Sequence, residues 1–82
     1  MDWVVYILRC KDGSYYTGIT NALTRRIEQH NAGKGAKYTK GRGPVELAYH
    51  EEQPDRSSAS KREAAIKALS KKKKEALILS MK

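Results

Sequence analysis

Two tyrosines, an arginine and a histidine near the start of the chain have types and spacings that suit chemistry. Tyr6 and Tyr16 lie on segments that predict paired strands, where alternating side chains can bring both hydroxyls to one face. Gly18 would leave space beside them for a ligand or a close backbone approach. Arg26 and His30 are four residues apart in a predicted helix, so they share one helix face. The free N–H groups at the start of that helix, with an arginine beside them, suit a phosphate. Two structural tyrosines and a solvated basic helix face are the alternatives.

A second candidate region is the segment 33–44, which contains four glycines, four cations and no acid. This composition predicts a loop that favours anions. Its cations can track the phosphates of a nucleic acid and its tyrosine can stack on a base; these residues are Lys34, Lys37, Tyr38, Lys40 and Arg42. A solvated connection is the alternative. The run Lys71 to Lys74 is more typical of a solvated helix face.

The charge of the whole chain points the same way. Seventeen Lys and Arg against nine Asp and Glu give a net charge of +8, which favours a polyanionic partner, first of all nucleic acid. No segment pairs a basic face with a bulky apolar face, so we expect no membrane partner. No run of 18 apolar residues is present, so we expect no membrane-spanning helix. Simple solubility is the alternative explanation of the charge.

The lone Cys10 and the chain start bear on compartment and cofactors. A single cysteine forms no internal disulfide, suits a reducing compartment and supplies no Cys/His zinc cluster. The residues after Met1 lack the basic-then-apolar pattern of a signal peptide. We therefore expect a cytoplasmic protein.

The elements that must position these residues follow from hydrophobic periodicity and turn signals. Asp12-Gly13 is a hairpin signal, Thr20 or Asn21 can cap the first helix, and Gly33 can end it. In chain order we expect strands 3–10 and 15–20, helix 22–32, strand 45–50, and helices 57–69 and 71–81. The eighty-two residues should form one domain, 1–82, of the α+β class: a three-stranded antiparallel sheet flanked by helices in the order β-β-α-β-α-α. The predicted core positions of the three helices are Leu23 and Ile27, then Ala65, Ile66 and Leu69, then Ala76, Leu77 and Leu79.

These residues, taken together, resemble the GIY-YIG nuclease superfamily, which includes the N-terminal nuclease domain of the repair protein UvrC. The resemblance rests on Tyr6 after Val4-Val5, on Tyr16-Thr17-Gly18, and on Arg26 with His30 in the next helix. Three further stretches resemble the small stand-alone bacterial members of the YhbQ type: Asn31 to Thr39, Gly41 to Pro44 and Lys61 to Lys67. The whole resemblance covers roughly residues 3–79 and implies the fold of that family.

The resemblance also implies an activity and roles for single residues. It implies hydrolysis of nucleic-acid phosphodiesters, more in DNA than in RNA, with one divalent metal ion, Mg²⁺ or alternatively Mn²⁺, and with no small-molecule cofactor. Glu63 would be the metal ligand, and Arg26 would stabilise the transition-state phosphate. Tyr6 would activate or orient the attacking water, Tyr16 would help to position water or phosphate, and His30 would form a hydrogen bond near the nucleophile.

Glu63 also has two structural interpretations. Ser60-Lys61-Arg62-Glu63 fits a capping box, and Glu63 with Lys67 fits a salt bridge between residues four apart. Three functions remain open from the sequence. They are a metal-dependent nuclease acting on structured or damaged DNA, a nucleic-acid-binding module with the same fold that cleaves poorly or not at all, and a small basic protein-interaction or ribosome-associated domain.

Overall fold

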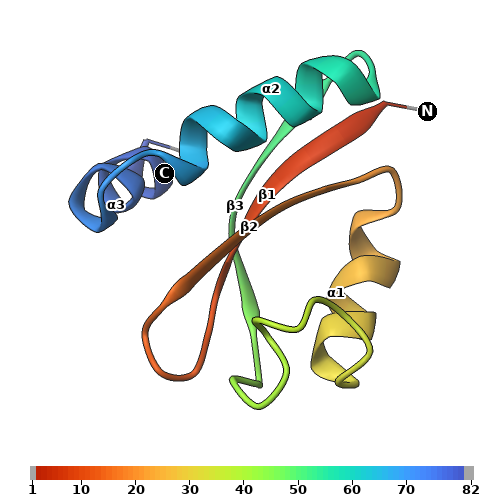
Figure 1. Ribbon diagram of the computed structural model, residues 1–82, viewed down its shortest axis with the longest axis vertical. Helices are drawn as coiled ribbons and strands as arrows, with labels where there is room; N and C mark the ends of the chain where they lie inside the picture. Colours follow the sequence, from red (N-terminus) through yellow and green to blue (C-terminus); the bar gives the residue numbers. More distant parts are fainter. Residues whose placement is uncertain (1, 81–82) are drawn as a thin grey trace.

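A three-stranded antiparallel sheet forms the centre of the protein (Figure 1). The computed structural model describes residues 2–80. The strands are β1 (Trp3–Arg9), β2 (Tyr15–Thr20) and β3 (Glu46–Gln53), and β1 lies between the other two. Their β-branched and aromatic residues suit a pleated sheet that is covered on both faces. The predicted fold class and the order β-β-α-β-α-α are confirmed.

Helices cover both faces of this sheet. Helix α1 (Leu23–Asn31) lies on one side, and α2 (Arg56–Lys67) and α3 (Lys71–Leu79) lie on the other (Figure 1). Asp55 caps α2 by accepting a hydrogen bond from the Ser58 N–H at 2.8 Å. The predicted cap of α3 is confirmed, because Ser70 accepts from the Lys73 N–H at 3.2 Å. None of the helices within residues 2–80 has the length and apolar character needed to span a bilayer.

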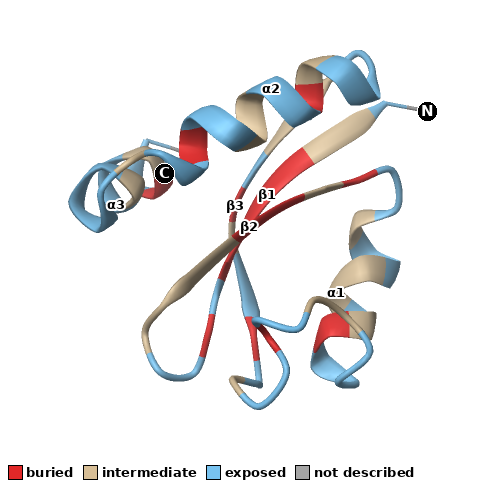
Figure 2. Ribbon diagram, viewed as in Figure 1, coloured by how far each residue is buried: buried red, intermediate tan, exposed pale blue. Residues whose placement is uncertain are grey.

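Alternation along β1 divides the interior into two cores. Figure 2 shows buried residues in red on β1 and on the helices at both sides of the sheet. Val5 and Ile7 point toward α2 and α3, where they join Ile66 and Ile78. Tyr6 and Leu8 point the other way and pack with residues of α1, including the predicted core positions Leu23 and Ile27. The candidate chemistry of the hairpin and α1 therefore belongs to a different face from the residues that anchor α2.

Several predicted boundaries and caps are wrong. The first helix begins at Leu23 with Ala22 as its N-cap residue, and no side chain caps it. The Thr20 hydroxyl instead accepts from the Ala22 N–H at 3.0 Å, which closes the turn that leads into the helix. The third strand continues to Gln53, beyond its predicted end at residue 50, because β1 pairs with it as far as Trp3.

The predicted core faces of the last two helices are partly wrong. Ile66 is fully buried as predicted, whereas Ala65 is exposed and Ala59 is buried. In α3 the buried residue is Ile78, while Ala76 is exposed and Leu79 is 62 % exposed. Both helices carry small or polar residues around most of their circumference, so their sequences define the buried stripe weakly.

Candidate active site

The hairpin register brings Tyr6 and Tyr16 together on the face that α1 covers. Tyr6 pairs with Gly18 across the two strands and Leu8 pairs with Tyr16, so the two tyrosines are offset by two residue pairs and lie on the same face. Their ring centroids lie 6.3 Å apart, and Tyr6 is only 1 % exposed. The geometry predicted from alternation is therefore present.

Gly18 is the residue that allows the Tyr6 ring to lie across β2. A Cβ atom built at position 18 would lie 2.7 Å from the Tyr6 hydroxyl oxygen and 3.1 Å from a ring carbon of Tyr16. The sequence predicted that Gly18 leaves space for a ligand or a close backbone approach. The space is filled by the Tyr6 phenol itself, so the glycine fixes the position of a candidate catalytic hydroxyl.

His30 reaches the same point from the last turn of α1. Its Nε2 atom lies 3.0 Å from the Tyr6 hydroxyl oxygen, and its ring centroid lies 5.2 Å from that of Tyr16. His30 is only 1 % exposed, and a histidine that is so buried usually has a hydrogen-bond partner at each ring nitrogen. Tyr6, Tyr16 and His30 thus form a buried cluster.

Burial keeps Tyr6 and His30 uncharged. It raises the pKa of the Tyr6 phenol above its usual range; the nearby Arg26 guanidinium opposes that shift, and Tyr16 and Glu63 add to it. Burial also lowers the pKa of His30, and the positive charge of Arg26 lowers it further. At neutral pH both groups are therefore neutral, and Tyr6 has no phenolate available without a proton acceptor.

The lowered pKa of His30 predicts a pH dependence of stability. As the pH falls below about 6.5, the unfolded chain takes up this proton before the folded chain does, so the free energy of unfolding should fall. We expect denaturant titrations to show this loss between pH 7.5 and 5.5, above the range of the carboxylates. The exposed histidine provides the control: His50→Gln should keep the loss, whereas His30→Gln should reduce it. An undiminished loss in His30→Gln would contradict the assignment.

Arg26 lies beside a cavity that suits a phosphate. Its Nη1 donates to Gln29 Oε1 at 3.1 Å, which holds the guanidinium along the helix. The cavity, of about 190 Å³, is lined by Thr20, Asn21, Ala22, Arg25, Arg26 and Gln29. Two guanidinium groups and no carboxylate line it, next to a helix start that no side chain caps and whose first turn has no acid.

Glu63 approaches the site from α2, on the other face of the sheet. Its carboxylate is close enough to the Tyr6 phenol to raise the pKa of that group. Its side chain is 22 % exposed and pairs with Lys67 at 3.4 Å, so the predicted salt bridge is confirmed. The predicted capping box is wrong, because α2 begins at Arg56 and Ser60 lies inside the helix.

The loop 33–44 brings Tyr38 to the tyrosine cluster, whereas its cations either pair within the protein or lie exposed at the surface. Tyr38 stacks on Tyr16 with ring centroids 6.0 Å apart, and it is 39 % exposed. Arg42 is engaged within the protein, since it pairs with Asp12 at 3.2 Å and lies 4.2 Å above the Tyr38 ring. The other three predicted cations of the loop are exposed: Lys34, Lys37 and Lys40.

Thr39 and Gly35 are site residues that the sequence did not reveal. Thr39 is 1 % exposed, and its hydroxyl oxygen lies 2.8 Å from Nδ1 of His30. A Cβ atom at position 35 would overlap the His30 ring. A buried threonine in a glycine-rich basic loop gives no periodic signal, so only the tertiary structure identifies it.

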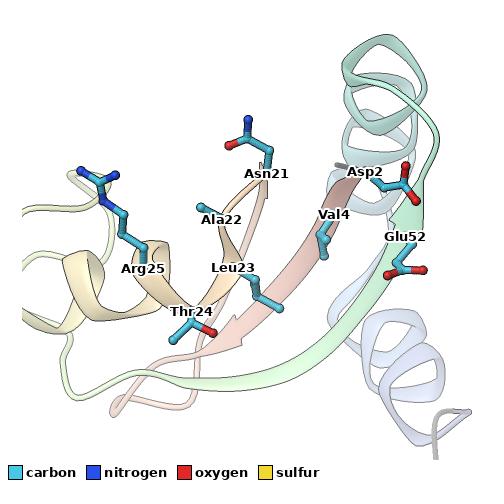
Figure 3. Close-up of a pocket in the computed structure, with 8 residues that line it drawn as sticks. All are labelled: Asp2, Val4, Asn21, Ala22, Leu23, Thr24, Arg25 and Glu52. Atoms are coloured by element: carbon cyan, nitrogen blue, oxygen red, sulfur yellow. The ribbon is translucent and has the colours of Figure 1, made fainter.

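A second cavity shares Asn21, Ala22 and Arg25 with the cavity beside Arg26, but no residue of the tyrosine cluster lines it (Figure 3). It has a volume of about 670 Å³ and lies where α1 begins, between Val4 and Leu23. The carboxylates of Asp2 and Glu52 line it together with Arg25. None of the predicted catalytic residues lines this cavity, and its two acids would repel a phosphate, so it does not extend the candidate site.

Comparisons with known proteins identify the family of this chain. Residues 2–76 match the family described as the GIY-YIG catalytic domain. A UPF0213 protein from Desulfotalea psychrophila is 56 % identical over 77 residues, which is 93 % of this chain and 70 % of that protein. A UPF0213 protein from Halobacterium salinarum is 53 % identical over 73 residues, 89 % of this chain and 95 % of that protein.

Two solution NMR structures are also similar. That of a UPF0213 protein from Bacillus halodurans has a TM-score of 0.62 and 51 % identity, covering 100 % of this chain and 86 % of that one. That of an E. faecalis protein has a TM-score of 0.67 and 41 % identity, covering 99 % of this chain and 86 % of that one. With its β-β-α-β-α-α fold and this match over nearly its whole length, the chain belongs to the GIY-YIG family, which supports a nuclease-type function on nucleic acid.

Proposed function

We propose that the protein is a metal-dependent endonuclease that hydrolyses phosphodiester bonds in DNA, with structured or damaged DNA as its candidate substrates. The observation that carries this proposal is the buried hydrogen bond between the Tyr6 hydroxyl and Nε2 of His30, at 3.0 Å. Arg26 and Glu63 lie within electrostatic reach of that hydroxyl from opposite faces of the sheet. This hydrogen bond also stabilises the fold, but only a cleavage reaction would use His30 as the acceptor of the Tyr6 proton.

The proposed reaction begins with proton transfer through Tyr6. Because the raised pKa of Tyr6 leaves no phenolate at neutral pH, the phenol can accept a proton from water only as it passes its own to His30. The hydroxide oxygen then forms a bond to phosphorus, the bond to the leaving oxygen breaks, and that oxygen takes a proton from solvent. Arg26 stabilises the negative charge on the phosphoryl oxygens, and Tyr16 orients the water or the phosphate.

The residues present fit a divalent cation held by one carboxylate. Among residues 2–80 no three His, Cys, Asp or Glu side chains gather, so Glu63 would hold the ion with water and phosphate oxygens completing its shell. Bound there, Mg²⁺ or Mn²⁺ would supply stabilisation of charge on the leaving oxygen.

One observation favours a second function, a binding module that cleaves weakly or not at all. Glu63 is already paired with Lys67, so a metal ion must displace that ammonium group or share the carboxylate with it.

The two functions predict different results in a direct assay on purified protein. Branched, nicked and plain DNA duplexes and an RNA duplex are incubated with Mg²⁺, and parallel reactions contain a chelator. The nuclease proposal predicts chelator-sensitive cuts in DNA, most in branched or nicked duplexes. The module predicts salt-sensitive binding without cuts.

Removal of the exposed loop cations should weaken DNA binding. We expect Lys34, Lys37 and Lys40 changed together to Ala to lower affinity and to reduce the slope of log K against log salt by about 0.9 for each phosphate that the variant no longer neutralises. Cleavage at saturating protein should persist, because these lysines do not contact the tyrosine cluster. The matched control is the variant in which Lys72, Lys73 and Lys74 of α3 are changed to Ala, because it removes the same amount of positive charge. Equal losses of affinity in both variants would discard a specific role for the loop.

The cellular setting proposed for this activity is the cytoplasm. The free and buried Cys10 suits a reducing compartment. The partner is nucleic acid, with no membrane and no small-molecule cofactor involved.

A further inference from the structure

The loop 33–44 encloses the His30 ring on the side away from Tyr6. Thr39 is buried there, and its Oγ1 lies 2.8 Å from Nδ1 of His30. Gly35 lies against the same ring, where any larger residue would overlap it. Both ring nitrogens of His30 therefore have partners within the protein: Tyr6 at Nε2 and Thr39 at Nδ1.

The hydrogen-bond partners of Thr39 decide which nitrogen carries the proton. The Thr39 hydroxyl lies 2.9 Å from the carbonyl oxygen of Ala36, to which it donates its only hydrogen. A carbonyl oxygen only accepts, so at this distance the hydroxyl must donate. The Thr39 oxygen is then left as an acceptor toward His30 at 2.8 Å, which requires a proton on Nδ1. The Nε2 lone pair consequently faces the Tyr6 hydroxyl at 3.0 Å.

The opposite tautomer creates a worse conflict. If Nδ1 carried no proton, it would accept from Thr39 and from the Ala36 N–H, which is 3.4 Å away. The Thr39 and Ala36 oxygens would then face each other as two acceptors at 2.9 Å. In the first arrangement the conflict is between the N–H groups of His30 Nδ1 and Ala36, whose nitrogens are 3.4 Å apart. This contact is longer, so the repulsion is weaker than that between two oxygens at 2.9 Å.

We propose that Thr39 is a positioning residue that holds neutral His30 in the Nδ1–H tautomer, so that Nε2 is the acceptor for the Tyr6 proton. The other charged or titratable groups that face His30 are Tyr16, with its ring 5.2 Å away, and Arg26. Neither occupies a ring nitrogen, so the tautomer is decided by Thr39 and Tyr6 against the longer contact of the Ala36 N–H with Nδ1. The catalytic consequence rests on the proposed nuclease function, whereas the tautomer itself does not.

Nitrogen-15 NMR of the labelled protein tests the tautomer directly, without DNA or metal. The chain has two histidines, and His50→Gln leaves only the signals of His30. At pH 7.5 we expect the Nδ1 shift of a protonated nitrogen and the Nε2 shift of an unprotonated one. In Thr39→Val, which keeps the shape but removes the hydroxyl, the proton should move to Nε2, whereas Thr39→Ser should keep it on Nδ1. A protonated Nε2 in the wild type, or an unchanged tautomer in Thr39→Val, would overturn the proposal.

Cleavage assays supply the second arm. Loss of a partner that orients a functional histidine typically costs about 10-fold to 100-fold, so we expect kcat to fall by that factor in Thr39→Val with little change in KM. Thr39→Ser should restore most of the rate. A normal kcat in a Thr39→Val variant that has the altered tautomer would refute the positioning role. If the wild-type protein cuts no DNA, the nuclease proposal fails, but the NMR result still decides the tautomer. If Thr39→Val does not fold, the tautomer is determined from the wild type and Thr39→Ser.

Discussion

Tyr6→Phe is expected to lower the rate of DNA cleavage by about 100-fold to 10,000-fold, the range associated with a general acid–base group. The variant keeps the ring that packs across Gly18 but loses the hydroxyl that links water to His30. It also leaves Nε2 of His30 buried without a partner, which should reduce the free energy of unfolding by about 1–3 kcal/mol. A domain of this size usually has more stability than that, so the variant should fold and bind DNA.

The same hairpin offers a matched control for this change. Tyr15 lies on β2 next to Tyr16 but points to the opposite face, where its hydroxyl donates to Glu75 at 3.3 Å. Tyr15→Phe removes the same atom at a distance from the proposed reaction and should leave cleavage unchanged. Single-turnover rates on a branched duplex compare the two variants. A Tyr6→Phe protein that cuts at the wild-type rate would show that the phenol plays no part in activating water.

The half of the site formed by the hairpin and α1 can be predicted from the sequence, because its geometry depends on residues that are close in the chain. The Asp12-Gly13 turn, with Gly13 at a φ of 85°, sets the register of the hairpin. Once the register is set, alternation places Tyr6 and Tyr16 on one face. Helical spacing then places Arg26 and His30 on one side of α1. Each step depends on residues that are close in the sequence.

The half formed by α2 and the loop depends on long-range packing. Asp55 and Ser60 are both good helix caps, and only the path of β3 to Gln53 decides that α2 begins after the first of them. The face of the helix that carries Glu63 therefore remains ambiguous in the sequence. Thr39 and Gly35 acquire their importance only by touching a ring on another segment, and a glycine-rich loop has no period from which this contact could be inferred.

Glu63→Gln is expected to abolish metal-dependent cleavage while it leaves DNA binding intact. Loss of the one carboxylate proposed to hold the ion removes several kcal/mol of charge stabilisation, which corresponds to a loss of roughly 1,000-fold or more in rate. The substitution keeps the shape of the side chain and frees Lys67 from its 3.4 Å ion pair. Affinity for DNA should therefore stay the same or rise.

Metal binding and cleavage can be separated in this variant. Titration with Mn²⁺ in the presence of uncleaved DNA, followed by electron paramagnetic resonance and corrected for the Mn²⁺ that the DNA alone binds, should show one additional bound ion in the wild type and no additional ion in Glu63→Gln. The control is Glu46→Gln, which removes a carboxylate that is 68 % exposed and belongs only to a surface pair with Arg9. That control should bind the ion and cut DNA normally, because surface pairs contribute little and Glu46 is not among the groups that shift the pKa of Tyr6. If Glu63→Gln cuts DNA as fast as this control, the carboxylate of α2 serves only its bond to Lys67, and the metal-dependent part of the proposed mechanism must be abandoned.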